Sequence, residues 1–240
     1  MNVILQIRNV SKSFGGLKAV DGVSFALDRG DIAALIGPNG AGKTTLFNLL
    51  GGVTQGDNGR IDFDGQDITA WPAHRRARVG IGRTFQIAAT FRSMSVIENI
   101  ETALMAAGLE TAAATALLDE VGIANLARTA VTELAYGDVK RVELAMVLAT
   151  KPALLLLDEP TAGMAADERQ RIMRIIAALV AARGITVLFT EHDMDAVFGF
   201  ATRVLAMDQG KLIANGTPDA VRADTRVQQI YLGNAEDDDA

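Results

Sequence analysis

The chain contains 240 residues, of which 49% are apolar and 22% are charged. This composition is typical of a folded protein with a full hydrophobic core, and it excludes a largely disordered chain. The formal net charge is −6, and four of the acidic side chains lie together at residues 236–239. The rest of the chain is close to neutral. It lacks the basic surplus with which nucleic-acid binders neutralise phosphates, so we expect no nucleic-acid partner.

Cysteine is absent from the sequence, which excludes disulfide bonds, thiolate metal sites and a cysteine nucleophile. Residues 1–6 lack the basic and long apolar segments of a secretory signal, so we expect none. Every apolar run is far shorter than the ~20 residues that span a bilayer. We therefore expect a soluble chain, which works at a membrane only beside another polypeptide.

The first half of the chain begins with predicted β structure and continues with predicted helices. Apolar or alternating runs favour strands at 3–10, 20–27, 32–36 and 60–68. Asp64-Gly65 is a hairpin turn within the last of these. Helical periodicity predicts helices at 95–118, with a break at Gly108, and at 136–150.

The second half alternates between strands and helices, which favours a parallel sheet. Four leucines at 154–157 are typical of a parallel strand covered on both faces. Thr217 is a helix cap, followed by a proline at the first helical position. The other predicted elements are helices at 166–182 and 193–200 and strands at 186–190, 204–207 and 212–215. Together the two halves predict an α/β core from both ends of the chain, with a helical insertion between them.

Residues 37–44 match the phosphate-loop pattern G-x-x-x-x-G-K-[ST], between the predicted strand 32–36 and an apolar helix. Glycines let backbone N–H groups converge on phosphate oxygens, and the helix N-terminus adds a partial positive charge. We expect Lys43 to reach the β- and γ-phosphates, Thr44 to ligate Mg²⁺, and Thr45 to donate to an α-phosphate. The candidate nucleotide-binding residues of this loop are Gly37, Pro38, Asn39, Gly40, Ala41, Gly42, Lys43, Thr44 and Thr45.

Two adjacent carboxylates, Asp158 and Glu159, follow the four leucines. Because successive side chains of a strand point to opposite sides, we expect the two acids to have different tasks. Asp158 is predicted to face Mg²⁺ beside Thr44, and Glu159 to face the γ-phosphate and polarise the attacking water. A solvated pair at a strand end is the alternative for these acids taken alone.

Single residues after two other predicted strands are further candidates. Gln86 closes the stretch 81–85 and could hold Mg²⁺ or the lytic water; a surface amide is the alternative. His192 follows the strand 186–190 at its carboxyl end, where ligands gather in parallel sheets. It could contact the γ-phosphate and orient the water, or it could be a structural hydrogen bonder.

The order of these motifs resembles the ATP-binding subunits of ABC transporters over nearly the whole chain. The signature of that family, L-S-G-G-Q, corresponds here to Leu-Ala-Tyr-Gly-Asp at 134–138. This variant resembles the subunits of branched-chain amino acid importers. Four further segments share that resemblance: Arg-Thr-Phe-Gln at 83–86, Glu-His-Asp-Met at 191–194, Asn-Gly-Thr-Pro at 215–218 and Tyr-Leu-Gly at 231–233.

The resemblance implies an α/β fold with a RecA-like P-loop core, an N-terminal antiparallel β layer and an inserted α-helical subdomain. The core would comprise 1–90 and 150–234 and the helical subdomain 91–149, with a disordered acidic tail at 235–240. It also implies a head-to-tail pair, formed with a second copy or a paralogue, that sandwiches two ATP molecules. The signature segment, with Gly137 and Asp138, would contact the ATP of the opposite subunit.

By the same resemblance, Phe14 corresponds to the aromatic residue that stacks on adenine; a buried ring in the β layer is its alternative. Ala135 replaces the serine of the signature and removes one hydroxyl donor. The loop at 162–165 lacks the polar residue usual in the family. Communication between two ATP sites would therefore differ here.

The resemblance further implies transmembrane permease subunits as partners, and a periplasmic or extracellular substrate-binding protein as an indirect one. The chain would then be peripheral to the cytoplasmic face of the plasma membrane. A groove beside Gln86 would receive a short helix of the permease, and Phe91, Arg92 and Met94 are candidates to line it. Simple packing of the insertion is the alternative for Phe91 and Met94.

Three other functions remain open. The ATPase subunit of lipopolysaccharide export shares a similar C-terminal Tyr-Leu-Gly, but its signature is closer to the strict form. A soluble ABC ATPase acting on ribosomes or DNA usually has two nucleotide domains or a long coiled-coil insertion, for which 240 residues leave no room. A small P-loop kinase needs neither Glu159 nor the segment 134–138.

Overall fold

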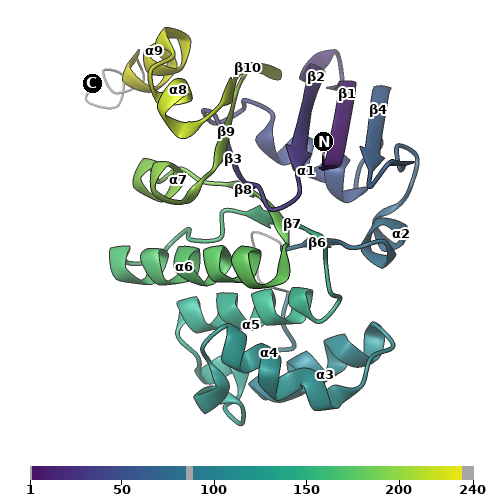
Figure 1. Cartoon of the computed structure of the whole chain (residues 1–240), viewed down its shortest axis with the longest axis vertical. Helices are drawn as coiled ribbons and strands as arrows, with labels where there is room; N and C mark the ends of the chain where they lie inside the picture. Colours follow the sequence, from purple (N-terminus) through teal and green to yellow (C-terminus); the bar gives the residue numbers. More distant parts are fainter. Residues whose placement is uncertain (1, 85–88, 234–240) are drawn as a thin grey trace.

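The computed structural model describes residues 2–84 and 89–233, and of residues 231–233 only the backbone (Figure 1). The predicted acidic tail at 235–240 therefore lies outside the described residues, as does Gln86. The described chain forms a four-stranded sheet and a six-stranded sheet. Helices lie on both faces of the larger sheet, and further helices extend the molecule beyond it (Figure 1).

The smaller sheet is antiparallel and has the strand order β2-β1-β4-β5. Its strands are β1 (Val3–Phe14), β2 (Leu17–Asp28), β4 (Asn58–Phe63) and β5 (Gln66–Asp67). The first two pair as a hairpin through a turn at Gly15-Gly16, where both φ values are positive. Two consecutive glycines suit this turn because they adopt positive φ without steric strain.

The larger sheet has the strand order β10-β9-β3-β8-β7-β6, and only β10 at its edge is antiparallel to its neighbour. The strands are β3 (Ile32–Ile36), β6 (Ile81–Arg83), β7 (Leu154–Asp158), β8 (Thr186–Thr190), β9 (Arg203–Asp208) and β10 (Lys211–Gly216). β3, β8 and β7 are consecutive parallel strands in the middle of the sheet. The loops that follow them therefore lie side by side at the carboxyl ends of the strands, which we call the carboxyl edge of the sheet.

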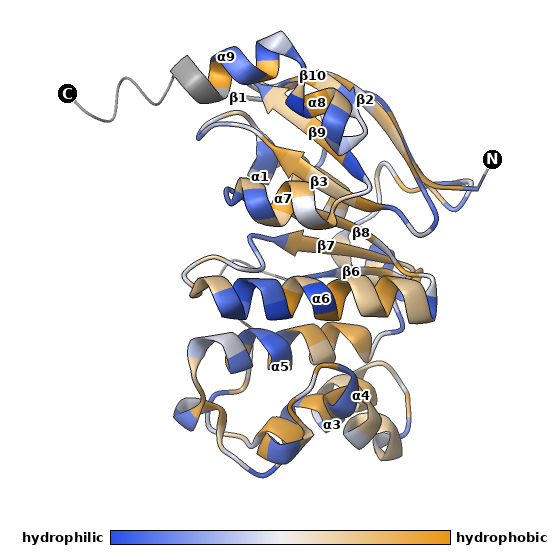
Figure 2. Cartoon of the chain, turned by 60° about the vertical axis from the view of Figure 1, so that its left-hand side comes forward, coloured by the Kyte–Doolittle hydropathy of each residue, from blue (hydrophilic) through white to orange (hydrophobic). Residues whose placement is uncertain are grey.

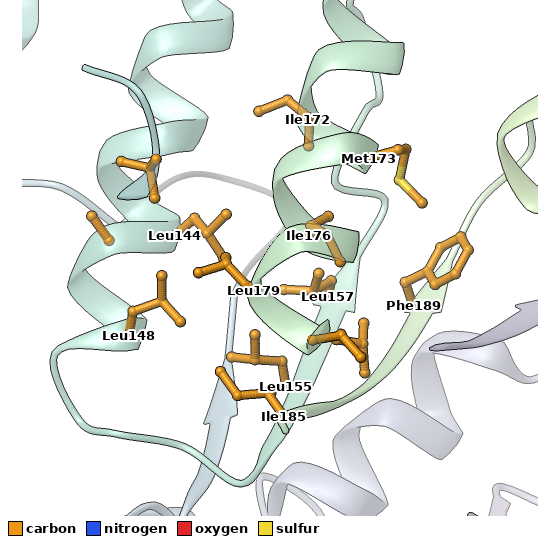
Figure 3. Packing of buried hydrophobic residues seen from close by; sticks show 14 of the residues in the cluster. Leu144, Leu148, Leu155, Leu157, Ile172, Met173, Ile176, Leu179, Ile185 and Phe189 are labelled. Atoms are coloured by element: carbon orange, nitrogen blue, oxygen red, sulfur yellow. The ribbon is translucent and has the colours of Figure 1, made fainter. Parts of the chain in front are cut away.

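The leucine run in β7 explains how the two faces of this sheet are covered. All four leucines are at most 1% exposed, and alternate residues pack on opposite faces. Leu154 and Leu156 pack on the side of α1 (Lys43–Gly51), between the two sheets. Leu155 and Leu157 face α6 (Ala166–Arg183), where Ile172, Ile176 and Leu179 cover them (Figure 3).

The helical part of the chain begins at α3 (Val96–Ala106) and ends with α5 (Tyr136–Leu148). A capping box fixes the first residue of α3: Ser95 accepts from the backbone of Glu98, whose carboxylate accepts from the backbone of Ser95. Between these helices lie α4 (Ala114–Glu120) and short 3₁₀ helices at Thr111–Ala113, Ala124–Leu126 and Val131–Glu133. In Figures 1 and 2, α5 lies against α6, on the side away from β7.

The remaining helices are α2 (Ala73–Arg78), α7 (Met194–Phe200), α8 (Pro218–Arg222) and α9 (Thr225–Gly233). The sequence pattern did not predict α2 or α9. For α2 the reason is its shortness and exposure: it is six residues long, and five of the six are exposed, so it shows no apolar periodicity. Figure 2 shows the central strands β3, β7 and β8 as mostly apolar, whereas α6 is largely hydrophilic in its N-terminal half and largely apolar in its C-terminal half. Among residues 2–84 and 89–233, no helix is both long and apolar enough to cross a lipid bilayer.

Candidate functional site

The phosphate loop connects β3 to α1, as the motif predicts. Gly37 and Gly42 have φ values of 156° and 100°, and a Cβ atom on either would overlap a backbone oxygen, that of Met207 or Ala19 respectively. Only glycine fits both positions. Leu46 makes the first helical bond, to the carbonyl of Gly42, so the preceding N–H groups of α1 point out of the helix start without a helical partner. The loop thus presents donors to an anion.

Lys43, the first residue of α1, is only 8% exposed. Its ammonium donates to the carbonyl oxygens of Gly37 at 2.5 Å and Pro38 at 3.0 Å. Burial lowers the pKa of Lys43, while the carboxylates of Glu159 and Asp158 raise it in part. The ammonium therefore lies within the electrostatic reach of both acids, and they favour its charged form.

Asp158, the last residue of β7, is held by its neighbours in the sheet. Its Oδ1 accepts from the hydroxyl of Thr190 at 2.8 Å, and its Oδ2 lies 3.6 Å from the guanidinium of Arg83. Thr190 is the partner of Asp158 in the parallel register of β7 and β8. The carboxylate is 8% exposed and therefore fixed at the sheet edge, where the phosphate loop also lies.

Glu159 and His192 come together although they are 33 residues apart. His192 Nε2 is 3.0 Å from Glu159 Oε1, and the imidazole N–H donates to the carboxylate. The expectation that Glu159 continues the strand was wrong, because β7 ends at Asp158 and Glu159 has a φ of 48°. Its side chain diverges from that of Asp158 through a left-handed backbone turn and not through strand alternation.

The signature segment lies apart from these residues within one chain. Ala135 caps α5 without a side-chain hydrogen bond, as the loss of the serine hydroxyl predicts. Gly137 is buried close to the carboxylate of Glu168 on α6, and Asp138 forms an ion pair with Arg141 at 3.2 Å. In Figures 1 and 2, α5 lies on the far side of α6 and β7 from α1. The structure therefore does not bring Gly137 and Asp138 to the phosphate loop of the same chain.

Phe14 lies at the hairpin end of β1 and is 52% exposed, so it is not the buried ring that was the alternative. The carboxylate of Asp57 fixes the chain directly before Phe14 through two hydrogen bonds. Asp57 accepts from the ammonium of Lys12 and from the N–H of Ser13, both at 2.7 Å. These two hydrogen bonds lower the pKa of the Asp57 carboxyl, with Lys12 the larger cause.

The sequence reasoning missed three polar residues beside the two acids. Thr190 is 1% exposed; its hydroxyl donates to Asp158 and accepts from the N–H of Glu159 at 3.0 Å. Glu191 and Thr161 are 4% and 1% exposed and are hydrogen bonded to each other. The sequence could have indicated these two residues, because Glu191 follows β8 and Thr161 follows β7. Polar groups just after neighbouring parallel strands lie close together in space.

A cavity of about 650 Å³ lies between the helical part and the larger sheet. It is lined by Ala103 and Ala106 of α3 and by Ala107 directly after that helix. The rest of the lining comes from α2, β6, Ala89 and the α5 region, the last with Glu143, Met146, Val147 and Thr150. Phe91, Arg92 and Met94 do not line this cavity. They were predicted to line a groove beside Gln86, which lies outside the described residues, so that role stays a prediction. Phe91 is instead tied through its backbone to Asn99 of α3, and Phe91 and Met94 are 47% and 38% exposed.

The phosphate loop between β3 and α1, together with Asp158 and Glu159 at the carboxyl end of β7, defines a P-loop nucleotide-binding protein. The sequence profile of the ABC transporter family matches residues 20–162, and a profile for branched-chain amino acid ATP-binding cassette transporters matches residues 211–237. The chain therefore belongs to the ABC transporter family, and it is an ATPase of that family.

Two curated relatives are similar over almost their whole length. The high-affinity branched-chain amino acid transport ATP-binding protein BraF of Pseudomonas aeruginosa is 37% identical, over 97% of this chain and 98% of BraF. The lipopolysaccharide export system ATP-binding protein LptB of Haemophilus influenzae is 37% identical, over 96% of this chain and 97% of LptB. The solved ADP conformation of MJ1267, an ATP-binding cassette of an ABC transporter, has a TM-score of 0.90 and 33% identity, over 97% of this chain and 100% of MJ1267.

Proposed function

We propose that the chain is the ATP-hydrolysing subunit of an importer for branched-chain amino acids or related amides. The observation that carries this proposal is the match of residues 211–237 to the branched-chain amino acid profile, in addition to the general ATPase match. The similarity to BraF over nearly the full chain supports the same cargo.

The chemistry of the site suits Mg²⁺ as the cofactor bound with ATP. Mg²⁺ prefers hard oxygen ligands, and it usually takes one or two carboxylates together with substrate phosphates and waters. Asp158 offers one carboxylate at the sheet edge, and Thr44 offers an exposed hydroxyl at the start of α1. The described residues contain no cluster of three or more acidic or histidine side chains that would hold a metal without phosphates. We propose Asp158, Thr44 and Gln86 as the residues that hold Mg²⁺, which would neutralise phosphate charge.

The proposed mechanism uses the contact between Glu159 and His192. The carboxylate of Glu159 accepts a proton from the attacking water, and His192 holds that carboxylate in place and contacts the γ-phosphate. Lys43 leaves the carbonyl oxygens of Gly37 and Pro38 when phosphate oxygens replace them, and it stabilises the charge of the transition state. Phe14, exposed at the hairpin end, stacks on adenine.

We propose that a second subunit, a copy or a paralogue, completes the site. The N-terminus of α5 with Gly137 and Asp138 lies away from the phosphate loop of its own chain, so its contact with ATP requires a partner. A helix N-terminus is suited to a γ-phosphate because its N–H groups and dipole favour negative charge. Binding of ATP would close the pair, and release of the products would open it.

The cavity between α2, α3 and α5 is our proposed docking site for a short helix of a transmembrane permease subunit. Its alanine-rich wall allows the backbone of a second helix to approach closely. The chain would then be peripheral to the cytoplasmic face of the plasma membrane. An external substrate-binding protein would deliver the cargo to the permease.

The alternative function is that of the ATPase subunit of lipopolysaccharide export, which the similarity to LptB favours. Deletion of the gene in its source organism separates the two. We expect the deletion to abolish high-affinity uptake of radiolabelled leucine, isoleucine and valine, and the wild-type gene to restore it, whereas Glu159→Gln does not. Normal uptake combined with a defective outer membrane would reject the importer and support the export function.

A further inference from the structure

Glu191 is a buried carboxylate beside the proposed catalytic pair that the mechanism above does not use. It directly follows β8 and is 4% exposed. Its Oε1 accepts from the N–H of Thr161 at 2.8 Å and from the hydroxyl of Thr161 at 2.6 Å. Its Oε2 accepts from the N–H of His192 at 3.2 Å. One oxygen of the carboxylate therefore binds the loop after β7, and the other binds the backbone of the loop after β8.

These two loops carry the two proposed catalytic side chains. Glu159 lies two residues before Thr161 in the loop after β7, and His192 directly follows Glu191 in the loop after β8. The strands themselves hold the loops together only as far as the pair Asp158 and Thr190, the last in the register. Beyond it, the Glu191 hydrogen bonds and the contact of Glu159 with His192 close a ring across the two loops.

The backbone of Glu159 needs such support. A φ of 48° is unfavourable for a residue with a Cβ atom, and it persists only where the surroundings impose it. On one side, the N–H of Glu159 donates to Thr190 at 3.0 Å. On the other side, the loop is held at Thr161 by Glu191. Hydrogen bonds to an ionised carboxylate are stronger than neutral ones, and these are buried.

A second link joins the far end of the same loops. Arg169 of α6 donates to the carbonyl of Met164 at 3.3 Å and forms an ion pair with Asp193 at 2.9 Å. Asp193 in turn caps α7 through the N–H of Ala196. The loop after β7 is thus tied to the loop after β8 at both of its ends, but only the Glu191 link is adjacent to the proposed catalytic pair.

We propose that Glu191 is a positioning residue for ATP hydrolysis: it joins Thr161 to His192 and so holds the Glu159 carboxylate and the His192 imidazole at reacting distance. This inference rests on the proposed function, because it requires Glu159 and His192 to act on the attacking water. Within residues 2–84 and 89–233, Glu191 lies off the phosphate loop, and its hydrogen bonds reach Thr161 and the backbone of His192 but no other proposed nucleotide ligand. Its loss should therefore lower kcat and leave the binding of ATP almost unchanged.

The test is steady-state ATPase kinetics of the purified chain with Glu191→Gln. The carboxamide keeps the size of the side chain, but it has only one acceptor oxygen. Either orientation leaves one of the two loops facing an NH₂ group that cannot accept. We expect kcat to fall by about 10- to 100-fold, since small misplacements of catalytic groups have effects of this size. KM and the affinity for a fluorescent ATP analogue should stay within about twofold of the wild type.

Thr161→Val provides a second, independent variant, because valine has the shape of threonine and keeps the backbone N–H that donates to Glu191. We expect a smaller loss of kcat, again with KM unchanged. The double variant should lose less than the product of the single losses, because both changes break the same link. Asp64→Asn serves as the matched control: Asp64, in the turn between β4 and β5, also has a φ of 48°, and it forms an ion pair with Arg29, directly after β2. Its kcat should equal that of the wild type.

Three outcomes would overturn the inference: an unchanged kcat in Glu191→Gln, a loss carried by KM, or multiplicative losses in the double variant. If Glu191→Gln fails to fold, as its melting temperature would show, Thr161→Val decides by the same criteria. Glu159→Gln in the same assay separates this inference from the proposed function. Normal turnover of Glu159→Gln rejects the catalytic assignment itself. An inactive Glu159→Gln beside a fully active Glu191→Gln rejects only the role of Glu191.

Discussion

His192 donates from its Nε2–H to Glu159 Oε1 across 3.0 Å, and this contact joins the loops after two neighbouring parallel strands. The carboxylate is partly buried and the imidazole is exposed, so the pair faces outward from the sheet edge. It lies on the same edge as the phosphate loop, whose lysine is within electrostatic reach of Glu159. Glu159, our proposed proton acceptor, is thus on the side of the sheet where the phosphate loop would hold a γ-phosphate.

The first prediction concerns Glu159→Gln. The amide can still accept the hydrogen bond from His192, but it cannot take a proton from water. We expect hydrolysis to fall by about 10³-fold while ATP still binds. The variant should then accumulate as an ATP-dependent dimer, which size-exclusion chromatography with and without Mg-ATP would detect. Turnover at the wild-type rate would exclude Glu159 as the proton acceptor.

The second prediction concerns Lys43→Ala. The ammonium that donates to Gly37 and Pro38 is the cation that phosphate oxygens would take over. Its removal should weaken ATP binding about 100-fold in isothermal titration calorimetry, because a buried charge-assisted contact is lost. Lys151→Ala is the control, since Lys151 is exposed ahead of β7, at the opposite edge of the sheet. Equal affinity in the two variants would contradict the assignment of the phosphate loop.

The third prediction concerns the pH dependence of stability at Asp57. Hydrogen bonds from Lys12 and Ser13 lower the pKa of this carboxyl in the folded state. The stabilisation is therefore complete above the unfolded pKa and disappears as the pH falls through the folded value. We expect Asp57→Asn to reduce the free energy of unfolding at about pH 7 and to differ less from the wild type at about pH 3. Urea unfolding of both proteins across this range measures the difference, and a constant difference would refute the explanation.

The fourth prediction concerns Arg76, a fully buried guanidinium that donates to four carbonyl oxygens at 2.6 to 3.0 Å: those of Leu49, Leu50, Thr69 and Trp71. Burial lowers its pKa to about 10, so it stays charged at neutral pH. Two of the carbonyls belong to the last turn of α1, where a positive charge is favourable. Arg76→Met should destabilise the fold by about 3 kcal/mol because the carbonyls lose their donor.

Urea denaturation of Arg76→Met beside Arg78→Met tests this prediction. Arg78 is on the same short helix but is exposed, so its replacement should change stability by less than about 0.5 kcal/mol. If the two variants are equally stable, Arg76 does not act as a cap for α1.

The sequence predicted the core elements well because their patterns are local. The leucine run of β7, the glycine-rich loop after β3 and the hairpin turn at Asp64-Gly65 each depend on the backbone preferences of a few adjacent residues. The phosphate loop and the two acids could be found in this way. The division of the chain into core and helical subdomain stays a prediction.

Other features depend on tertiary structure and could not be predicted. The contact of Glu159 with His192 requires the parallel register of β7 and β8 as well as the left-handed turn at Glu159. Arg76 is a charged residue on a short polar helix, and its burial depends on the carbonyls at the end of α1. The cavity is formed by α2, α3 and α5, which are distant in sequence, and the sequence pattern alone does not indicate it.

A crystal structure of the chain grown with Mg²⁺ and a non-hydrolysable ATP analogue tests the central claim most directly. We expect the triphosphate on the backbone N–H groups of residues 39–45, with the base on Phe14. The ammonium of Lys43 should have moved from the carbonyl oxygens of Gly37 and Pro38 to the β- and γ-phosphates. A loop without nucleotide, with Lys43 still on those carbonyl oxygens at saturating analogue, would contradict the account.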